Sequence, residues 1–404
     1  MSLENLVYKI SSGAVSRRNL MIPTSKSFCN RVLVLAAQSL EKKTIKYLSN
    51  STDVLNLIKV FDQVGLKYSL KNQEITFKNS FPACELKTSK RIELDSGDGG
   101  TTNRFLMAML ATGKNQYLLK ANPEMLKRPM EELIEALNSL GAKVEQIDSG
   151  YLIQGPINHK TKISINSKRS SQFYTALKLI APSADLDVEA IEMESSQAYA
   201  KMTDHLVDEL QRKNSISVPV DFSSLGYLVA LGVLTDGFQH PQVTSVDADQ
   251  ADHAILNILE NAGANVSISE KGISIKPCSL KPIVGDGRQY PDLIPTLVFL
   301  ASHIEGKSKF VGLEVLKHKE SDRIFEMLRI LDFVGVKYQY DSLTFTLEVE
   351  GSVSKYRAFE YFAPNDHRMI MMAALFMRKN YGGLIYNAQH VKKSFPNFFE
   401  FLAD

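Results

Sequence analysis

The chain is 404 residues long, with 44% hydrophobic and 23% charged residues and a formal net charge of +2. These fractions are typical of a soluble globular protein, and the near-neutral charge gives no support to a role in binding nucleic acid or a membrane surface. Since a single core rarely grows beyond about 250–300 residues, we expect two domains of roughly 200 residues each.

Cysteine and histidine usage indicates the compartment and the cofactor class. Cys29, Cys84 and Cys278 are scattered and odd in number, which argues for a reducing compartment and against a disulfide framework or a zinc site. The eight histidines show no HxxxH or HExxH spacing. The segment Met1–Gly13 has no apolar run of signal-peptide length, and no later segment approaches about 18 consecutive apolar residues. We therefore expect a cytoplasmic protein with no metal and no other cofactor.

Two kinds of element alternate along the chain. The first is a polar cluster that leads directly into a strongly apolar helix, and such helices are predicted to begin at Ser25, Thr101, Ser170, Ser223, Pro291 and Asp366. These starts are 76, 69, 53, 68 and 75 residues apart, which indicates six units of about 67 residues. Helices that are apolar nearly all round belong inside a core. We therefore expect three buried parallel helices in each half of the chain, covered by sheets.

The second element is an amphipathic helix that ends in glycine and leads into a hairpin. It occurs four times, and its glycines are Gly65, Gly141, Gly263 and Gly335. Glycine just past a helix usually adopts the left-handed conformation that caps the last turn. The alternating residues that follow each glycine predict two short strands joined by a polar turn.

Cations lie unusually close to the start of several apolar helices. The Ser, Thr and Asp residues at these starts are ordinary N-caps, and a capped core helix is the simplest interpretation of any one of them. Yet Lys26, Arg31, Arg104 and Arg368 fall in first or second turns, where the helix macrodipole disfavours positive charge. A bound anion would offset that cost, because helix N-termini favour anions. The pattern predicts a site for a multiply charged substrate.

Seven short stretches then identify a family. They are "PTSKSFCNR", "GGTTNRFL", "KRPMEELIEAL", "SSQF", "KHKESDRI", "NDHRM" and "KKSFPNFF". Together they resemble the successive signatures of the enolpyruvylshikimate-phosphate synthases, the 3-phosphoshikimate 1-carboxyvinyltransferases of aromatic amino-acid synthesis. The stretches extend from Pro23 to Phe399 and so cover nearly the whole chain. Any one alone is a weak signal, whereas seven in the family's order are highly specific.

The resemblance implies an α/β fold, a two-domain inside-out α/β barrel in which each domain has three βαβαββ units around buried parallel helices. Domain I is expected to be discontinuous, with residues 1–24 and 221–404, and domain II to comprise residues 25–220. The active site is expected in the cleft between the domains. The partners implied are two small molecules, with no nucleic acid and no membrane, and we expect a monomer.

The family transfers the enolpyruvyl group of phosphoenolpyruvate to the 5-hydroxyl of shikimate 3-phosphate and releases phosphate. Motif matching implies that phosphoenolpyruvate contacts Lys26, Gly100, Arg128, Gln172, Arg323, Arg368 and Lys393. It implies that shikimate 3-phosphate contacts Ser27, Arg31, Ser170, Ser171, Gln172, Ser196, Tyr199, Asp292 and Lys319. The catalytic residues implied are Asp292, Glu320 and Lys26.

The chemistry of the reaction suits these residue types. Arginine binds carboxylates and phosphates in a bidentate manner, and the two substrates carry several negative charges. Adding a hydroxyl across an enol double bond needs a base for the hydroxyl and an acid for the methylene carbon. The carboxylates of Asp292 and Glu320 can supply both, while Lys26 and Lys393 stabilise developing charge. Without the resemblance, Asp292 would be interpreted as a helix N-cap and Glu320 as a solvated first-turn acid.

The chain departs from the family pattern at three positions. Asp98 and Val315 stand where asparagine is usual, and Lys201 stands where a neutral or acidic residue is expected. These departures put substrate affinity in question more than reaction class. They keep open the alternative of a catalytically weakened, ligand-binding relative.

A second alternative is the sister enolpyruvyl transferase that acts on UDP-N-acetylglucosamine. That enzyme usually has a cysteine on a mobile loop over its site. Here no cysteine lies between Cys84 and Cys278, so the loop ahead of Arg128 has none. The stretches "SSQ" and "KESDR" also favour shikimate 3-phosphate as the acceptor.

Overall fold

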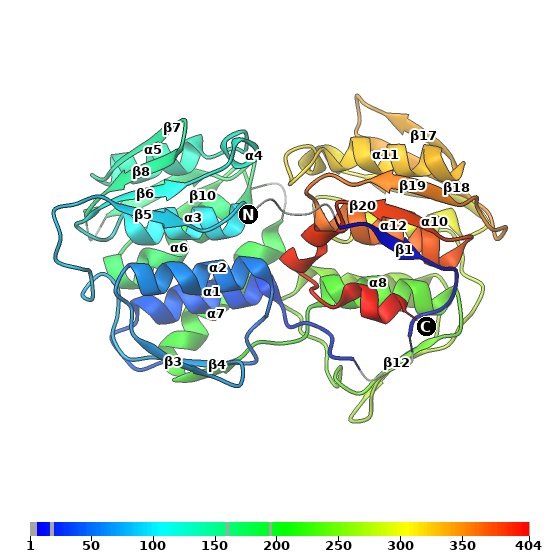
Figure 1. Cartoon of the computed structure of the whole chain (residues 1–404), viewed down its shortest axis with the longest axis horizontal. Coiled ribbons are helices and arrows are strands. Elements are labelled where there is room, and N and C mark those ends of the chain that lie inside the picture. Colours follow the sequence, from blue (N-terminus) through cyan, green and yellow to red (C-terminus); the bar gives the residue numbers. More distant parts are fainter. Residues whose placement is uncertain (1–5, 17–19, 159–160, 194–195, 404) are drawn as a thin grey trace. The chain divides into compact units, whose positions relative to one another are not determined.

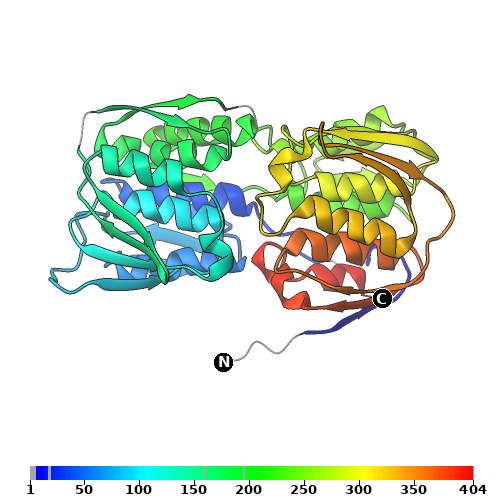
Figure 2. The ribbon, with the colours of Figure 1, turned by 90° about the horizontal axis from the view of Figure 1, so that it is seen from above.

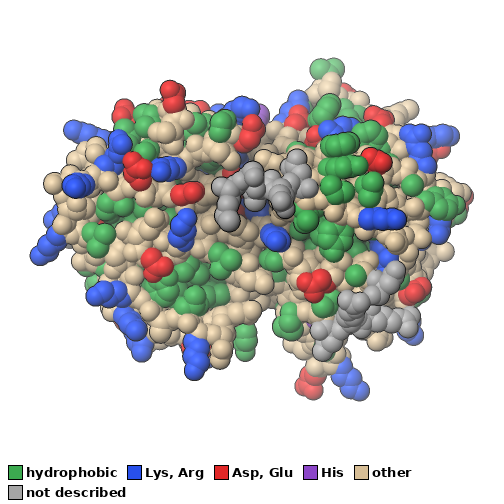
Figure 3. Space-filling view, in the orientation of Figure 1, with side chains coloured by type: hydrophobic (Ala, Val, Ile, Leu, Met, Phe, Trp, Pro, Cys, Tyr) green, Lys and Arg blue, Asp and Glu red, His purple; other side chains and the backbone are tan. Residues whose placement is uncertain are grey.

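The computed structural model describes residues 6–16, 20–158, 161–193 and 196–403. The chain divides into two compact units: unit 1 comprises Met1–Pro23 and Val220–Asp404, and unit 2 comprises Thr24–Pro219. Within the described residues, no helix is both long and apolar enough to cross a membrane. On the face seen in Figure 3, Lys and Arg side chains are interspersed with Asp and Glu, in keeping with the small net charge.

Unit 2 is built from helices wrapped by short strands. Its helices are α1 (Lys26–Gln38), α2 (Thr52–Gln63), α3 (Gly100–Leu110), α4 (Pro123–Leu126), α5 (Glu131–Ser139), α6 (Ser171–Ala184) and α7 (Gln197–Arg212). Its strands are β2 (Thr44–Lys46), β3 (Tyr68–Lys71), β4 (Glu74–Phe77), β5 (Ile92–Asp95), β6 (Gln116–Lys120), β7 (Lys143–Ile147), β8 (Gly150–Gln154), β9 (Lys162–Asn166), β10 (Asp187–Ile191) and β11 (Ser215–Ser217). The described strands form sheets in the orders β11-β2-β4-β3, β5-β6-β8-β7 and β10-β9. Helices α1, α3 and α6 pack against one another inside these sheets (Figure 1).

Unit 1 repeats this plan. Its helices are α8 (Phe222–Val233), α9 (Ala254–Asn261), α10 (Ile294–Ser302), α11 (Arg323–Val334) and α12 (His367–Lys379), with short 3-10 turns η1 (Ala251–His253), η2 (Leu313–Leu316), η3 (Ala388–Lys393) and η4 (Phe398–Leu402). Its strands are β1 (Tyr8–Ile10), β12 (Phe238–His240), β13 (Val266–Ser269), β14 (Gly272–Ile275), β15 (Val284–Asp286), β16 (Gly306–Val311), β17 (Lys337–Asp341), β18 (Thr346–Gly351), β19 (Phe359–Phe362) and β20 (Gly383–Tyr386). The described strands form sheets in the orders β1-β20-β19, β12-β14-β13 and β15-β16-β18-β17. Helices α8, α10 and α12 pack together, and Figure 2 shows the helices of each unit lying alongside one another with strands along the outside.

The predicted βαβαββ unit is clearest in two places. In the segment from β5 to β8, the first two strands are parallel, and the hairpin β7–β8 adds antiparallel to β6. The segment from β15 to β18 has the same order and the same directions. A helix between the first two strands makes their parallel pairing possible, since parallel strands need a crossover. The internal repeat in the sequence therefore corresponds to a repeated structural unit.

The helices predicted to be buried are buried. In α10 all nine residues are buried, and in α1 every residue from Phe28 to Gln38 is buried. Since burying one large aliphatic side chain contributes about 1.5–3 kcal/mol, these helices are held by the core rather than by helix propensity. Core packing therefore holds the first turns of these helices in place, and their side chains can contact a ligand there.

The glycine predictions are also confirmed. Gly65, Gly141, Gly263 and Gly335 have φ values of 95°, 98°, 108° and 84°. An antiparallel hairpin follows each of them. Only glycine adopts this left-handed region without steric cost, so the residue type at these positions directs the chain from helix into hairpin.

Three helix starts differ from prediction. Helix α3 begins at Gly100, one residue before Thr101. Helix α8 begins at Phe222 and is capped by Asp221, whose carboxylate accepts the Ser224 N–H at 3.1 Å. Helix α10 begins only at Ile294, because the residues from Tyr290 form a turn in which the Leu293 N–H bonds back to the Tyr290 carbonyl. Asp292 lies in this turn, so it is not an N-cap.

Candidate active site

In unit 2 the first turn of α1 presents a lysine held by a buried acid. Ser25 caps the helix by accepting the Phe28 N–H at 3.3 Å. Lys26 Nζ lies 3.0 Å from Asp53 Oδ2, and the two side chains are 12% and 4% exposed. Asp53 stands in the first turn of α2, where the macrodipole favours a negative charge. The ion pair fixes the ammonium group near the start of α1.

Arg31, one turn further along α1, is almost fully buried. Its Nε donates to Thr203 Oγ1 at 2.9 Å, and its Nη1 donates to the Ser27 carbonyl at 2.7 Å. The guanidinium also lies over the rings of Phe105 and Tyr199, at 5.4 and 5.6 Å. Burial lowers the pKa of Arg31 to about 10, so the side chain remains a cation at neutral pH. Its location joins α1 to Tyr199 and Thr203 of α7.

Two further arginines lie beside the start of α3. Arg104 Nη1 donates to Gln172 Oε1 and its Nη2 donates to the Pro129 carbonyl, each at 2.6 Å. Burial and the nearby charge of Arg128 lower the pKa of Arg104 to about 9. Among the described residues, Nε of Arg104 and both Nε and Nη1 of Arg128 are buried without a hydrogen-bond partner. Two adjacent cations with unused donors favour an anion between or beside them.

Gly100 lies against the Arg128 guanidinium. A Cβ atom at position 100 would stand 2.4 Å from Arg128 Cζ, far inside van der Waals contact. The absence of a side chain at Gly100 therefore lets the guanidinium lie directly over the first turn of α3. This close approach brings the positive end of the helix and a cation to one place.

The predicted acceptor-binding residues of unit 2 lie at the first turns of α6 and α7. Ser170 caps α6 by accepting the Gln172 N–H at 3.2 Å, and Ser171 is buried. Ser196 precedes α7 with a left-handed backbone, φ 58°, and its carbonyl accepts the Tyr199 N–H at 3.1 Å. Four helices of unit 2 therefore carry predicted site residues at their N-termini: α1, α3, α6 and α7.

In unit 1 a buried network surrounds Asp292. Arg323 Nη1 donates to Asp292 Oδ1 at 2.8 Å, and Arg368 Nη2 donates to Asp292 Oδ2 at 2.8 Å. Arg323 Nε also donates to Asp366 Oδ2 at 2.8 Å. Burial alone would raise the pKa of Asp292, but the charges of Arg368 and Arg323 outweigh it and hold that pKa well below its usual range. Asp292 is therefore an ionised carboxylate between two guanidinium groups.

Glu320 is the second predicted catalytic carboxylate, and it belongs to the same network. Its Oε2 lies 2.8 Å from His367 Nδ1, and its Oε1 lies 3.3 Å from Lys393 Nζ. The side chains of Glu320 and Lys393 are 11% and 5% exposed. Glu320 precedes α11, whose N-cap is Asp322, so it is neither a first-turn residue nor solvated. The half-buried Lys319 adds positive charge, which helps to lower the pKa of Asp292.

Glu320, Asp366 and His367 also place potential metal-ligating atoms within 4.8 Å of one another. The carboxylates of Glu320 and Asp366, however, already pair with cationic side chains. Arg323 donates to Asp366, and Lys393 lies against Glu320. A divalent ion would have to compete with these positive charges, so we assign no metal to this group.

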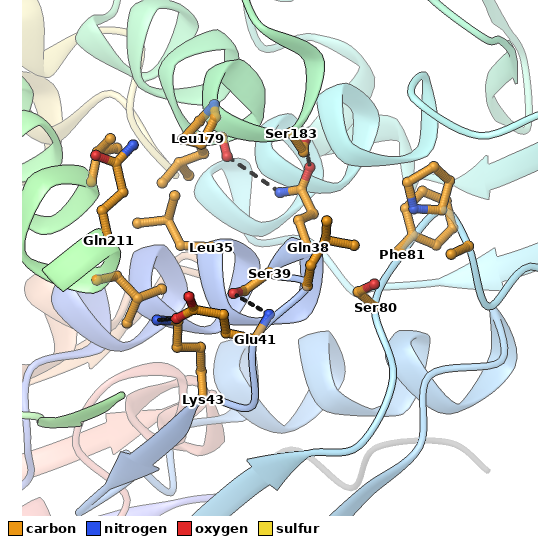
Figure 4. A pocket seen from close by; sticks show the side chains of 16 residues that line it. Leu35, Gln38, Ser39, Glu41, Lys43, Ser80, Phe81, Leu179, Ser183 and Gln211 are labelled. Carbon is orange, nitrogen blue, oxygen red and sulfur yellow. Dashed lines mark hydrogen bonds and ion pairs between the residues drawn. The ribbon is translucent and has the colours of Figure 1, made fainter. Parts of the chain in front are cut away.

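A separate pocket of about 410 Å³ lies in unit 2, toward the C-terminal ends of α1, α6 and α7 (Figure 4). Its lining includes none of the predicted site residues. Gln38 Nε2 donates to the Val34 and Leu179 carbonyls, and Lys43 Nζ lies 2.8 Å from Glu41 Oε2. Because these polar groups are satisfied within the protein, the pocket offers little to anchor a charged substrate, and we assign it no part in the reaction.

The three departures from the family pattern lie in different surroundings. Val315 is half-buried and packs against the hydrophobic core of unit 1, whereas Lys201 is exposed on α7. Asp98 is half-buried, directly before Gly99 and Gly100 at the start of α3. Asp98 and Lys201 each lie two residues from a predicted site residue, Gly100 and Tyr199, and Val315 lies four residues before Lys319.

Sequence reasoning missed two acids of these networks, Asp53 and Asp252. Asp53 pairs with Lys26, and Asp252 contacts Ser223 at the start of α8. An acid in the first turn of a helix, like Asp53, is ordinary. Asp252 lies in the 3-10 turn η1, within the Asp-rich stretch "VDADQADH". Neither position carried a signal that separates it from an unremarkable surface acid.

Comparison with known proteins decides the family. The profile of the EPSP synthase family, 3-phosphoshikimate 1-carboxyvinyltransferase, matches residues 13–402. The chain belongs to the EPSP synthase family. Its relatives include a 3-phosphoshikimate 1-carboxyvinyltransferase of Syntrophobacter fumaroxidans, 29% identical over 95% of this chain and 96% of the relative. Another, from Pyrococcus abyssi, is 27% identical over 99% of this chain and 97% of the relative.

Solved structures agree with the EPSP synthase fold. The EPSP synthase of Acinetobacter baumannii has a TM-score of 0.74 at 23% identity and covers 98% of this chain and 97% of its own. The enolpyruvyl transferase NikO of Streptomyces tendae has a TM-score of 0.74 at 14% identity. It covers 99% of this chain and 97% of its own. At 23% and 14% sequence identity, the structural similarity shows only that the fold is shared. The predicted two-domain α/β fold of the EPSP synthases is confirmed.

Proposed function

We infer that the protein transfers the enolpyruvyl group of phosphoenolpyruvate to the 5-hydroxyl of shikimate 3-phosphate and releases phosphate, a step of the shikimate pathway to aromatic amino acids. The family match over residues 13–402 carries this inference. The buried Asp292–Arg323–Arg368 network and the arginines beside α3 support it, because they supply an acid–base carboxylate and several cations for anionic substrates. The expected cytoplasmic location and monomeric state belong to this proposal.

In unit 2 we propose that the donor anion contacts Lys26, Arg128 and Gln172, next to Gly100. The unused donors of Arg128 support this assignment. We propose that shikimate 3-phosphate contacts Ser27, Arg31, Ser170, Ser171, Gln172, Ser196 and Tyr199, most of them at helix N-termini that favour a phosphate.

In unit 1 we propose that Arg323, Arg368 and Lys393 bind the donor, and that Asp292 and Lys319 contact the acceptor. Asp292 is held ionised by two guanidinium groups, so it is a proton acceptor rather than a donor at rest. If the donor anion draws those guanidinium groups away, the pKa of Asp292 rises and the carboxylate becomes a stronger base. That both units act on one substrate pair rests on the family resemblance.

The proposed reaction has two steps. The acceptor oxygen bonds to the central carbon of phosphoenolpyruvate while the methylene carbon gains a proton. Loss of phosphate and of one methyl proton then restores the double bond. Asp292 and Glu320 together carry these proton transfers, and Lys26 stabilises the charge that develops.

Offering two acceptors to the purified protein tests this function. We expect phosphate release from phosphoenolpyruvate with shikimate 3-phosphate and none above background with UDP-N-acetylglucosamine. The reverse preference would identify the sister transferase. Saturable binding of both substrates without phosphate release would identify a ligand-binding relative.

The close approach of Gly100 to Arg128 gives a further prediction. Gly100→Ala should displace the Arg128 guanidinium, because the added Cβ would stand 2.4 Å from its Cζ. Losing one charge-assisted contact of about 1.5–3 kcal/mol should raise the KM for phosphoenolpyruvate about 10- to 100-fold. The KM for shikimate 3-phosphate should change far less. An unchanged donor KM, measured by steady-state kinetics, would contradict the assignment of Arg128 to the donor.

A further inference from the structure

Arg169 and Glu132 form a bidentate ion pair that joins two segments of unit 2. Arg169 directly precedes Ser170, the cap of α6, and Glu132 lies in the first turn of α5. Arg169 Nε donates to Glu132 Oε1 at 2.5 Å, and its Nη2 donates to Glu132 Oε2 at 2.7 Å. The same Nη2 donates to Glu131 Oε2 at 2.7 Å. Two parallel bonds between a guanidinium and a carboxylate fix both distance and direction.

Each of the joined segments carries predicted site residues. Arg128, which we assign to the donor, stands three residues before Glu131, and residues 170–172 of the acceptor site follow Arg169 directly. Among the described residues, Nε and Nη1 of Arg128 are buried without a hydrogen-bond partner. Neither atom therefore anchors the Arg128 side chain, and its guanidinium is placed by the backbone that carries it.

Arg104 makes a second bridge between the same segments. Its Nη2 donates to the carbonyl of Pro129, the residue after Arg128, and its Nη1 donates to Gln172 Oε1, each at 2.6 Å. Arg104 is buried, whereas the Arg169 side chain is 43% exposed. Residues 167–170, between β9 and α6, have neither helix nor strand structure, so side-chain contacts help to determine where they lie. Arg104 ties the segments on the buried side, and Arg169 ties them on the exposed side.

We propose that Arg169 is a positioning residue: its ion pair with Glu132 holds residues 170–172 of the acceptor site in place relative to Arg128 of the donor site. Without the pair, residues 167–170 move more freely, and part of the binding energy of both substrates is spent on restoring the arrangement. Affinity therefore falls more than turnover at saturation. This inference rests on the proposed function, because it concerns the same site.

Substitutions on the two sides of the ion pair separate position from charge. Arg169→Ala removes the pair, and we expect the KM of each substrate to rise about 3- to 10-fold while kcat changes less than twofold. Glu132→Ala also removes the pair but makes this part of the protein less negative. Charge alone would lower the KM of these anionic substrates in Glu132→Ala, whereas the positioning role predicts the same 3- to 10-fold rise.

Two further variants test the geometry of the pair. Arg169→Lys keeps the charge but not the planar fork, so it should recover only part of the affinity lost in Arg169→Ala. The double variant Arg169→Ala/Glu132→Ala should bind no worse than either single variant, because the same contact is lost in all three.

Arg91→Ala is the matched control. The Arg91 side chain is 44% exposed, and its Nη2 lies 3.8 Å from Glu93 Oε1. Arg91 precedes β5, whereas Gly100 of the predicted site follows that strand. Arg91→Ala should leave both KM values within twofold of the unaltered protein. Because exposed ion pairs contribute little to stability, the thermal unfolding midpoints of all variants should stay within about 4 °C of the unaltered protein.

An unchanged or lowered KM in Glu132→Ala would overturn the positioning role, because charge alone would then explain any effect of Arg169→Ala. If the unaltered protein releases no phosphate with both substrates, the proposed function fails. Calorimetric titration with shikimate 3-phosphate then tests the ion pair by itself, with a 3- to 10-fold weaker Kd expected in Arg169→Ala and in Glu132→Ala. No binding of shikimate 3-phosphate to the unaltered protein would overturn both proposals.

Discussion

Asp292→Asn is expected to lower turnover by about 10²- to 10⁴-fold, which corresponds to roughly 2 to 5 kcal/mol of lost transition-state stabilisation. The reason is that the amide cannot accept the proton of the acceptor hydroxyl. It can still fill the space between Arg323 and Arg368, which lie 2.8 Å from the two carboxylate oxygens. Binding of shikimate 3-phosphate should therefore fall far less than turnover.

Steady-state kinetics and calorimetric titration of the acceptor would check both halves of this prediction. Asp332→Asn is a matched control, since Asp332 is an exposed acid of unit 1 whose carboxylate accepts the Tyr338 hydroxyl at 2.9 Å. It should retain full activity. A turnover of Asp292→Asn within about threefold of the unaltered protein would make Asp292 a structural partner of the arginines only.

Arg323→Met is expected to destabilise unit 1 by about 3–5 kcal/mol, since removing one partner of a buried ion pair leaves uncompensated charge. Arg323 is 3% exposed and contacts Asp292, Asp366 and, at 3.8 Å, Glu320. Asp366 is fully buried, so its carboxylate cannot turn to solvent. Methionine keeps much of the side-chain volume, and the loss therefore reports charge rather than a cavity.

The pH dependence of this loss identifies its cause. A carboxyl group whose folded pKa is depressed, as for Asp292, stabilises the fold above its unfolded pKa, and the contribution is lost as pH falls through the folded pKa. The difference in thermal stability between Arg323→Met and the unaltered protein should therefore shrink as pH falls below about 4. Lys309→Met, which removes an exposed cation paired with Glu348 at 3.4 Å, should cost about 1 kcal/mol or less. Equal effects of the two substitutions would contradict the role given to Arg323.

The sequence predicts much of the fold because its signals are local. Glycine at position 65 or 335 has no Cβ to penalise a positive φ, and the length and composition of the apolar run after Ser25 favour a buried helix. Helix starts were less well placed where two signals compete, as at Pro291, where proline and the following turn delay α10 until Ile294.

The candidate site was predictable only as a set of unusual residues. Cations at helix starts pointed to an anion, and the family signatures supplied roles for Arg128, Arg323 and Arg368. The sequence could not show which acidic residue forms an ion pair with each Lys or Arg. The partners Lys26 with Asp53 and Arg323 with Asp366 are 27 and 43 residues apart, and only the packing of separate helices brings them together.

The most direct test of the central claim is phosphorus-31 nuclear magnetic resonance of the protein with phosphoenolpyruvate and shikimate 3-phosphate. We expect the phosphoenolpyruvate resonance to disappear, inorganic phosphate to appear in equal amount, and the acceptor's phosphate resonance to be retained at a shifted position. Neither change should occur when shikimate 3-phosphate is omitted. Retention of the phosphoenolpyruvate resonance in the complete mixture, with both substrates bound, would contradict the assignment of this chain as an enolpyruvyl transferase.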